Sequence, residues 1–406
     1  MDRMDSTFLG VMTTAQPRAT PIVTTVMPVR PLNVLALTLI NPIHTTNGTA
    51  LRVKPMLEEL GRRHRITLLC ADGFAAAPAP RKGRLRRLRA MADFSHPYSF
   101  QPEFQAAVNA AVASENFDVL LLSGAEMLQY IPAKSLSVVA DLVDEPVLAV
   151  LRNLNAIRGW EKIVMAKHAL SLLLYQRYWK NRLAAVLVVA PRDASTARRV
   201  LPGVLVREIA NGVDVEYFHP GGMPRLPYEI VFSGNMSFPP NIAACLWFAD
   251  HVFPRIRRAL PAAHWTIVGS QPHACIQQLA SRPGISVTGW VPDIRPYLEQ
   301  ASVCVSPLIS GGGIKNKILE AWAMQKAVVS TPLGCAGIET RDGNNILIAD
   351  DASTFADKTL TLLHDSQMAD RLGAEARRYV ETHYRWKDKA AELEILLCMI
   401  AAGGTQ

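Results

Sequence analysis

The sequence lacks several features that would assign it to a specialised class of protein. Its six cysteines lie far apart with no C-x-x-C pair, which argues against a disulfide framework or a structural zinc site. The longest uninterrupted apolar run has about seven residues, at 184–190, whereas a membrane-spanning helix needs roughly 20. We therefore expect a soluble cytoplasmic protein, in which most cysteines are reduced and buried as small apolar side chains.

The common nucleotide-binding and catalytic signatures are also missing. The sequence has no G-x-x-x-x-G-K-[ST], no G-x-G-x-x-G, no H-E-x-x-H and no G-x-S-x-G. Their absence removes the P-loop, dinucleotide-binding, zinc-peptidase and serine-hydrolase interpretations. D-x-D is absent as well, which speaks against a metal-dependent sugar transferase of the other major fold.

The composition that is present is that of a globular chain with a basic balance. Hydrophobic residues make up 49% and charged residues 19%, and the 406 residues are enough for about two domains. Lys and Arg outnumber Asp and Glu by 43 to 35, so an anionic partner is favoured without being identified. Residues 1–30, rich in Thr, Pro and Met, have no apolar period and are expected to form a flexible extension.

Short apolar runs alternate with helical patterns along the first half of the chain. Runs that are apolar throughout predict a parallel sheet covered by helices on both faces, which is a doubly wound α/β domain. The predicted strands are 32–40, 65–70, 117–122, 138–143 and 184–190. The predicted helices include one that buries Leu51, Met56, Leu57 and Leu60, and a long one over 147–182.

A second series of the same kind follows the Pro- and Gly-rich stretch at 220–224. Its predicted strands are 229–233, 265–269, 285–288, 303–307, 327–330 and 346–348, with helices over 241–259, 314–324 and 374–399. We assign 31–220 to a first Rossmann-like domain, 221–375 to a second, and 376–406 to a helical segment. Two such domains face each other across a cleft at the carboxyl ends of their strands, which is a natural nucleotide site.

The segment most informative about function is S-P-L-I-S-G-G-G-I-K-N-K-I-L-E-A at 306–321. A predicted strand ends at Pro307, and Gly311, Gly312 and Gly313 lead into a helix that we expect to begin near Gly313. Free N–H groups at a helix N-terminus bind anions. Helical spacing then places Gly313, Asn316, Lys317 and Glu320 on one face, and the apolar residues Ile314, Ile318 and Trp322 on another.

These residue types suit a diphosphate held above sugar or ribose hydroxyls. Lys315 and Lys317 lie at the positive end of the helix dipole, where each costs a few tenths of a kcal/mol unless an anion binds there. The alternative interpretation is a glycine-rich turn with a solvated Lys317–Glu320 surface pair, which contributes little.

Several motifs together resemble GT-B glycosyltransferases of family 4. The run 311–331 resembles their donor-site segment, and A-N-G-V-D at 210–214 with Phe218 and Pro220 resembles their domain junction. S-G-N-M-S-F-P-P-N at 233–241 resembles the opening of their second domain, and T-G-W-V-P-D at 288–293 resembles their T-G-x-V-x-D. The detail is most similar to the exosortase-associated sugar transferases of bacterial exopolysaccharide clusters.

The resemblance implies a retaining transfer of a sugar from a nucleotide-diphosphate sugar to a hydroxyl of a lipid-linked or growing glycan. It implies that Glu320 holds ribose hydroxyls, while Lys315, Lys317 and the Gly311–Gly313 amides hold the diphosphate. By the same resemblance, Gly234 and Asn235 belong to the donor site, and Asn47-Gly48 forms a facing loop with Arg52 as a helper. Trp290 could pack beside the nucleotide base, and a plain core role is the alternative for it. It implies no metal and no cofactor, because lysines and helix N–H groups neutralise the leaving diphosphate.

Three departures from the family pattern keep other functions open. The partner expected eight positions before Glu320 is Gly312, so the acid beside the transferred sugar is missing. Asn235 and Asn241 replace basic residues, and S-G-A-E at 123–126 stands where a histidine is common. The alternatives are a nucleotide-sugar 2-epimerase of the same fold and a non-catalytic scaffold that binds nucleotide or glycan.

Weaker signals concern the acceptor. Asp141 and Asp144 follow a predicted strand and could orient or deprotonate an acceptor hydroxyl, and Glu126 is similar; helix capping is the alternative for Asp144. The tract R-K-G-R-L-R-R-L-R at 81–89 could rest on anionic lipid at the inner membrane face, or simply be a solvated basic helix. Nucleic acid is the less favoured partner for this tract, because no stacking platform accompanies it.

Overall fold

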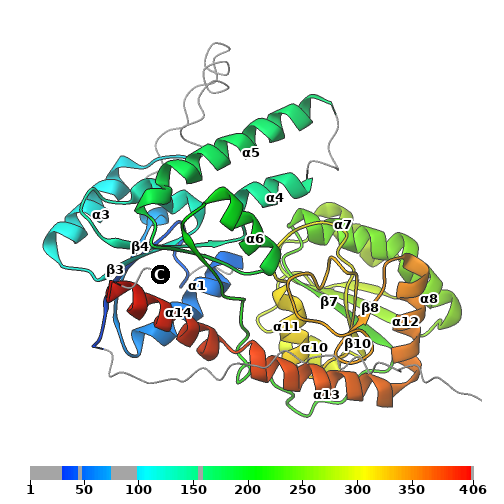
Figure 1. Cartoon of the computed structure of the whole chain (residues 1–406). Helices are drawn as coiled ribbons and strands as arrows, with labels where there is room; N and C mark the ends of the chain where they lie inside the picture. The colour runs from blue at the N-terminus through cyan, green and yellow to red at the C-terminus, as the bar shows by residue number, and fades with distance from the viewer. Residues whose placement is uncertain (1–29, 44–47, 75–97, 154–158, 404–406) are drawn as a thin grey trace, which may run out of the picture. The chain divides into compact units, whose positions relative to one another are not determined.

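A computed structural model describes residues 30–43, 48–74, 98–153 and 159–403 (Figure 1). The described chain contains two six-stranded parallel sheets, each with helices packed on it, and this confirms the α/β, GT-B class. No described helix is long and apolar enough to span a bilayer. The cysteines are all free thiols; Cys245, Cys304 and Cys335 are buried, whereas the other three are half-buried.

The first sheet has the strand order β2-β1-β3-β4-β5-β6. Its strands are β1 (Asn33–Thr38), β2 (Arg65–Cys70), β3 (Val119–Ser123), β4 (Ser137–Val143), β5 (Ala185–Val188) and β6 (Leu205–Glu208). Its principal helices are α1 (Gly48–Gly61), α3 (Pro102–Ser114), α4 (Pro146–Asn153), α5 (Trp160–Trp179) and α6 (Pro191–Val200). The sequence did not predict β6, because an edge strand of four residues, L-V-R-E, lacks the apolar run of the central strands.

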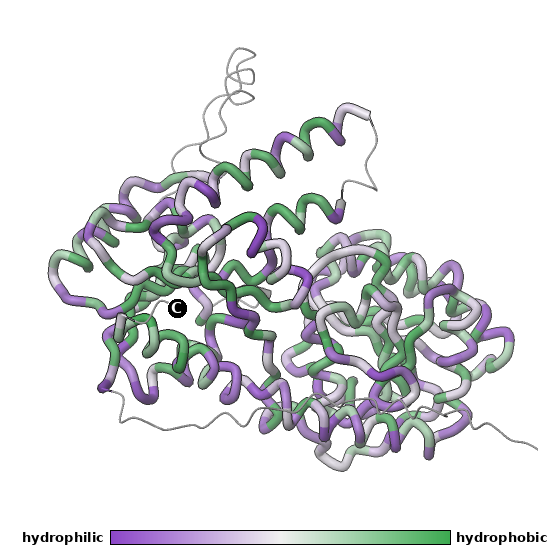
Figure 2. The backbone as a smooth tube through the Cα atoms, viewed as in Figure 1, coloured by the Kyte–Doolittle hydropathy of each residue, from purple (hydrophilic) through white to green (hydrophobic). Residues whose placement is uncertain are grey.

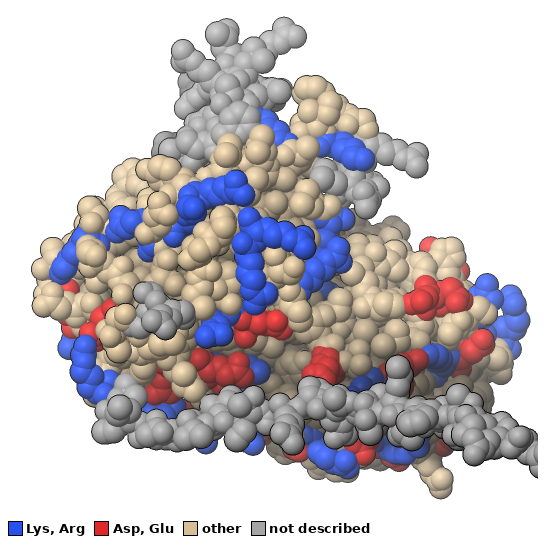
Figure 3. Space-filling view, in the orientation of Figure 1, with Lys and Arg blue, Asp and Glu red and all other residues tan. Residues whose placement is uncertain are grey.

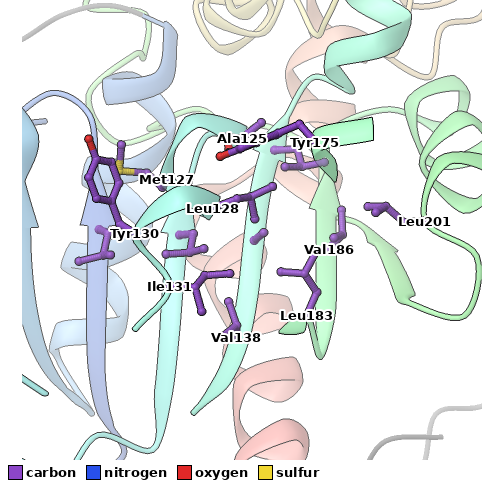
Figure 4. Close-up of a cluster of buried hydrophobic side chains, with 14 of the residues drawn as sticks. Ala125, Met127, Leu128, Tyr130, Ile131, Val138, Tyr175, Leu183, Val186 and Leu201 are labelled. Carbon is purple, nitrogen blue, oxygen red and sulfur yellow. The ribbon is translucent and has the colours of Figure 1, made fainter. Parts of the chain in front are cut away.

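The core of this half is formed by the apolar strands and the helices that cover them. Figure 4 shows Val138 and Val186 on neighbouring strands with Leu128, Ile131 and Tyr175 packed around them. Hydropathy follows the same pattern, with hydrophobic colour concentrated along the strands and hydrophilic colour on outward turns (Figure 2). This continuous burial is why the strands read as uninterrupted apolar runs.

Two predictions about the first helices were wrong. Met56 and Leu60 are buried as expected, but Leu51 is 42% exposed. The helix expected over 147–182 is interrupted: α4 ends at Asn153, and α5 begins at Trp160 after Gly159. Gly159 has a φ of 66°, which a right-handed helix cannot accommodate.

The second sheet has the order β12-β11-β10-β7-β8-β9. Its strands are β7 (Glu229–Ser233), β8 (His264–Val268), β9 (Ile285–Val287), β10 (Val303–Ser306), β11 (Val328–Ser330) and β12 (Leu347–Ile348). The helices include α7 (Pro239–Trp247), α8 (Phe253–Ala259), α9 (Ala274–Gln277), α10 (Arg295–Gln300), α11 (Asn316–Ala323) and α12 (Ala352–His364). All six strands lie where the sequence placed them, to within one or two residues.

The C-terminal stretch forms two helices where one was predicted over 374–399. They are α13 (Ser366–His383) and α14 (Trp386–Ala401), and the break coincides with backbone pairing of Val213 with residues 384 and 385. Leu393, Leu397 and Ile400 of α14 pack with Val34 and Met56 of the first half. Figure 1 accordingly shows α14, in red, beside α1, in blue.

Candidate functional site

The triple-glycine turn links β10 to α11 and has a backbone that favours glycine. Gly311 and Gly313 have φ values of 102° and 68°, in the region that L side chains rarely adopt. Helix α11 therefore begins at Asn316, three residues later than the sequence predicted. The apolar side of the prediction is confirmed, since Ile314, Ile318 and Trp322 are buried.

Lys315 folds back onto this turn. Its Nζ donates to the carbonyl oxygens of Gly312 and Gly313, the second at 2.7 Å. Burial lowers the pKa of Lys315 to about 8, and the nearby Asp144 carboxylate partly opposes that shift. Lys315 thus bonds to the turn itself, and its amine loses its proton at a lower pH than an ordinary lysine does.

Lys317 lies against the loop that follows β7. Its Nζ donates to Asn241 Oδ1 at 2.8 Å and lies 3.8 Å from the centre of the Phe232 ring. A methyl group placed on Gly234 would lie 3.1 Å from this Nζ, so the amine touches the glycine backbone. Burial lowers the pKa of Lys317 to about 7. The alternative of a solvated surface pair is wrong, because Lys317 bonds to a buried asparagine instead.

The loop after β7 is held together by its own amides. Asn241 Nδ2 donates to the Asn235 carbonyl oxygen at 2.7 Å. The Asn235 side chain accepts from Ser237 N at 2.9 Å and so closes the turn. The structure therefore brings Gly234, Asn235 and Lys317 together, as the sequence suggested.

Glu320 and the triple-glycine turn line two different cavities. Glu320 and Asn316 line a cavity of about 800 Å³ with residues of α1, residues 212–218 and residues 385–387. Gly311–Gly313 and Lys315 line a second cavity of about 490 Å³. Burial raises the pKa of Glu320 to about 7, with Lys317 opposing the shift, so this acid is partly protonated at neutral pH.

The first-sheet edge contributes a buried ion pair. Arg52 is fully buried, and its Nε donates to Asp141 Oδ2 at 2.7 Å. Arg52 Nη1 also donates to Asn211 Oδ1 at 3.0 Å, and Asn211 Nδ2 donates to Asn316 Oδ1 at 2.9 Å. Asp141, proposed from sequence to orient or deprotonate an acceptor hydroxyl, is thus bonded to Arg52, proposed as a helper in the facing loop. The series of hydrogen bonds continues to Asn316 of α11.

Asp144 and Arg152 touch the triple-glycine turn itself. A methyl group on Gly313 would lie 2.7 Å from Asp144 Oδ1, and one on Gly312 would collide with Arg152 Nη1. Both atoms are buried and have no hydrogen-bond partner in the described structure. Burial raises the pKa of Asp144, as does Asp193, whereas Lys315 and Arg152 lower it. These two groups are therefore available to a ligand at the turn.

The remaining sequence-predicted residues are spread more widely. Trp290 is 72% exposed, which excludes the core role that the sequence left open for it. Gly48 begins α1, while Asn47 and the basic tract 81–89 lie outside the described residues. Glu126 lies in the short 3-10 helix Ala125–Tyr130 that follows β3, and burial raises its pKa. In the described ranges no group of three or more His, Cys, Asp or Glu side chains is placed to hold a metal ion.

Comparisons with known proteins agree with this geometry. The family model described as glycosyl transferases group 1 matches residues 227–365, which contain the whole of the triple-glycine segment. Over these residues the chain is similar to the group 1 glycosyl transferases.

Two curated relatives align with the chain at low identity. A 44.6 kDa protein of the cps region of Klebsiella pneumoniae is 22% identical over 164 residues, covering 38% of this chain and less than half, 42%, of that protein. Alpha-maltose-1-phosphate synthase of Mycobacterium tuberculosis is 24% identical over 401 residues, covering 87% of this chain and 96% of the synthase.

Solved structures share the fold over most of the chain. Sucrose-phosphate synthase of Thermosynechococcus elongatus has a TM-score of 0.70 at 15% identity, covering 91% of this chain and all of that one. Anabaena HepE, solved with UDP and glucose, has a TM-score of 0.62 at 13% identity, covering 90% and 99%.

Sequence reasoning missed two residues of the candidate site. Arg152 lies on α4, and Asp193 follows β5 and bonds to Arg152 Nη2 at 3.0 Å. Asp193 could have been found, because side chains that follow the carboxyl ends of parallel strands meet at one edge of a sheet. Arg152 gave no comparable signal, since a lone basic residue near a helix end is usually solvated.

Proposed function

We propose that this protein transfers a sugar, with retention, from a nucleoside-diphosphate sugar to a hydroxyl group of a glycan or lipid-linked acceptor. The observation that carries the proposal is the buried, weakly compensated amine of Lys317 between Gly234 and Asn241, one turn from three glycines. Glu320 compensates this amine only in part, because no ion pair joins the two in the described structure, and an anionic ligand would remove the remaining cost of burying the cation.

The residues suggest how transfer would proceed without a bound metal. Lys317 and Lys315 would neutralise the charge that develops on the leaving diphosphate. Asp144 and Arg152 offer an unpartnered acceptor and an unpartnered donor beside the turn, where hydroxyl groups of the transferred sugar could bond. The ionised Glu320 carboxylate would accept a hydrogen bond from a hydroxyl group of the nucleoside portion.

The comparisons support the donor class and the setting of this proposal. HepE was solved with UDP, and the cps-region relative is consistent with a role in surface polysaccharide assembly. A cytoplasmic location follows from the supply of nucleotide sugars. Residues 81–89 remain a proposed contact with anionic membrane.

Melting temperature in the presence of UDP, GDP, ADP or TDP tests the donor site. A diphosphate at 100 times its Kd should stabilise the protein by about 2.7 kcal/mol. Lys317→Ala should abolish that stabilisation, whereas the matched change Lys358→Ala, at a remote surface pair with Asp342, should retain it. If no diphosphate stabilises the well-folded protein, the donor site is wrong.

A second measurement separates transfer from its alternatives. Incubation of the stabilising nucleotide's sugar without acceptor should leave the sugar's configuration unchanged, and NMR of the transferred product should show the donor's anomeric configuration. Interconversion of donors without acceptor would instead identify a 2-epimerase. Binding without turnover on any glycan acceptor would identify a scaffold.

A further inference from the structure

Helix α5 carries an exposed apolar stripe that the donor site does not use. Six large apolar side chains of this helix are between 46% and 77% exposed to solvent. They are Trp160, Ile163, Val164, Leu170, Leu174 and Tyr178. Contiguous exposed apolar surface of this kind marks an interaction site.

The spacing places these side chains on one face of the helix. At about 100° per residue, these positions from Trp160 to Tyr178 fall within less than half of the helix circumference, and Lys167 occupies the same face between Val164 and Leu170. The opposite face, with Ala169, Leu172 and Tyr175, is buried in the core of the first half, where α5 contacts α4, α6 and residues 125–130. The Tyr175 hydroxyl also donates to the Ala125 carbonyl oxygen at 3.3 Å (Figure 4), so the helix is anchored from behind.

The charge beside the stripe is almost all of one sign. Residues 160–180 contain four basic side chains and a single acid, Glu161. The basic residues are Lys162, Lys167, Arg177 and Lys180. In Figure 3 the side chains coloured over the part of the molecule that carries α5 are blue, while the red acidic ones lie lower in the view.

We propose that α5 seats the protein on an anionic lipid surface, lying in the plane of the membrane. Helices with an apolar face flanked by basic residues bind at the interface between headgroups and acyl chains. Trp160 and Tyr178, at the two ends of the stripe, have the amphipathic rings that favour that depth. Each basic side chain near an anionic surface adds to the attraction.

A second copy of the chain is the competing occupant of this face. Pairing two α5 helices would bring their basic side chains together, and like charges across an interface oppose association. The excess of basic side chains therefore favours an anionic partner over self-association. The proposal does not depend on sugar transfer, although a lipid-linked acceptor would give this surface a purpose.

Sedimentation of the full chain with vesicles tests the surface. Vesicles of phosphatidylcholine mixed equally with phosphatidylglycerol should bind the protein, and pure phosphatidylcholine should bind it at least about tenfold more weakly. The variant Ile163→Ser/Leu170→Ser/Leu174→Ser should lose at least about tenfold in affinity for the mixed vesicles. The matched variant Met223→Ser/Leu226→Ser/Ile395→Ser changes exposed apolar residues elsewhere and should bind like the parent.

Two further measurements keep the result decisive. Mixed vesicles should shift tryptophan fluorescence to the blue in the parent and much less in Trp160→Phe. Light scattering without lipid should give the same mass for the parent and the α5 triple variant. Equal vesicle binding by parent and triple variant, equal binding to both lipid compositions, or a dimer that only the triple variant loses would overturn the proposal.

Discussion

The carboxyl ends of the two sheets differ in how their buried charges are paired. At the first sheet, Arg52 and Asp141 neutralise each other at 2.7 Å, and Arg52 also bonds to Asn211. At the second sheet, Lys317 bonds to an uncharged amide, and its pKa falls to about 7. A compensated charge fixes the position of its neighbours, whereas an uncompensated one retains a capacity to bind an ion of opposite sign.

Removal of one partner of the compensated pair should have the largest effect on stability. Arg52→Met leaves Asp141 as a buried, unpaired carboxylate, which should lower the free energy of unfolding by about 3–5 kcal/mol. Urea denaturation at pH 7 measures this loss. Arg378→Met, at a surface pair with Glu375, is the control and should cost less than about 1 kcal/mol. A similar small loss at both sites would show that the buried pair is not structural.

The sequence predicted which loops meet at the donor turn, because that depends on the order of the strands. It did not predict where α11 begins, and so it did not predict the directions of that helix's side chains. Gly234 and Lys317 meet because both follow strand ends of one parallel sheet, a rule that the sequence reveals. The start of α11 at Asn316 could not be read, because the positive φ of Gly313 is a property of the folded turn. In the helix as it forms, Asn316 and Glu320 lie about 40° apart, whereas Lys317 lies about 100° from Asn316 and about 60° from Glu320.

The hydrophobic periodicity of the sequence also did not predict contacts between segments that are distant in sequence. The helical period near residue 384 is consistent with one helix, yet the backbone pairing of Val213 with Tyr384 separates α13 from α14. Arg152 reaches Gly312 only because the fold brings α4 to the turn, and no local signal encodes that approach. Local propensity therefore predicted the elements, and tertiary contacts decided their ends.

The next prediction concerns the pH dependence of diphosphate binding, which Lys315 and Lys317 should dominate. Lys317 and Lys315 have pKa values of about 7 and 8, and a bound diphosphate would hold both protonated. Affinity for the stabilising nucleoside diphosphate should therefore fall as pH rises from 7 to 9, by up to about tenfold per unit for each lysine, which is about 1.4 kcal/mol. The diphosphate itself is already ionised in this range, since phosphate groups lose their second proton near pH 6.

Calorimetry in buffers of different ionisation enthalpy measures the accompanying proton uptake. Lys317→Arg keeps its charge throughout this range and should flatten the profile. An affinity that is independent of pH between 7 and 9 in the parent protein would contradict a role for these amines in binding.

Two neighbouring glycines of the turn should differ in what they tolerate. Gly313 has a φ of 68°, and a methyl group there would press on the Asp144 carboxylate, so Gly313→Ala should cost about 1–2 kcal/mol of stability. Gly312 has no positive φ, and its methyl group would meet only the flexible end of Arg152. Gly312→Ala should therefore cost less than about 0.5 kcal/mol. Equal losses in urea denaturation would show that the turn's conformation does not require glycine at 313.

The smallest effect is expected at Asp144, where its sign is the informative quantity. Burial raises the folded pKa of Asp144 above its unfolded value, so its ionised form is less favourable in the folded protein. The stability associated with the protonated form is present at low pH and is lost as pH rises through the folded pKa. Asp144→Asn removes the charge and should be neutral or stabilising by a few tenths of a kcal/mol at pH 7, with the difference from the parent vanishing below about pH 4. A clear destabilisation at pH 7 would instead mean that the carboxylate holds Arg152 and Lys315 in place, as Asp141 holds Arg52, and the contrast between the two edges would then be one of degree.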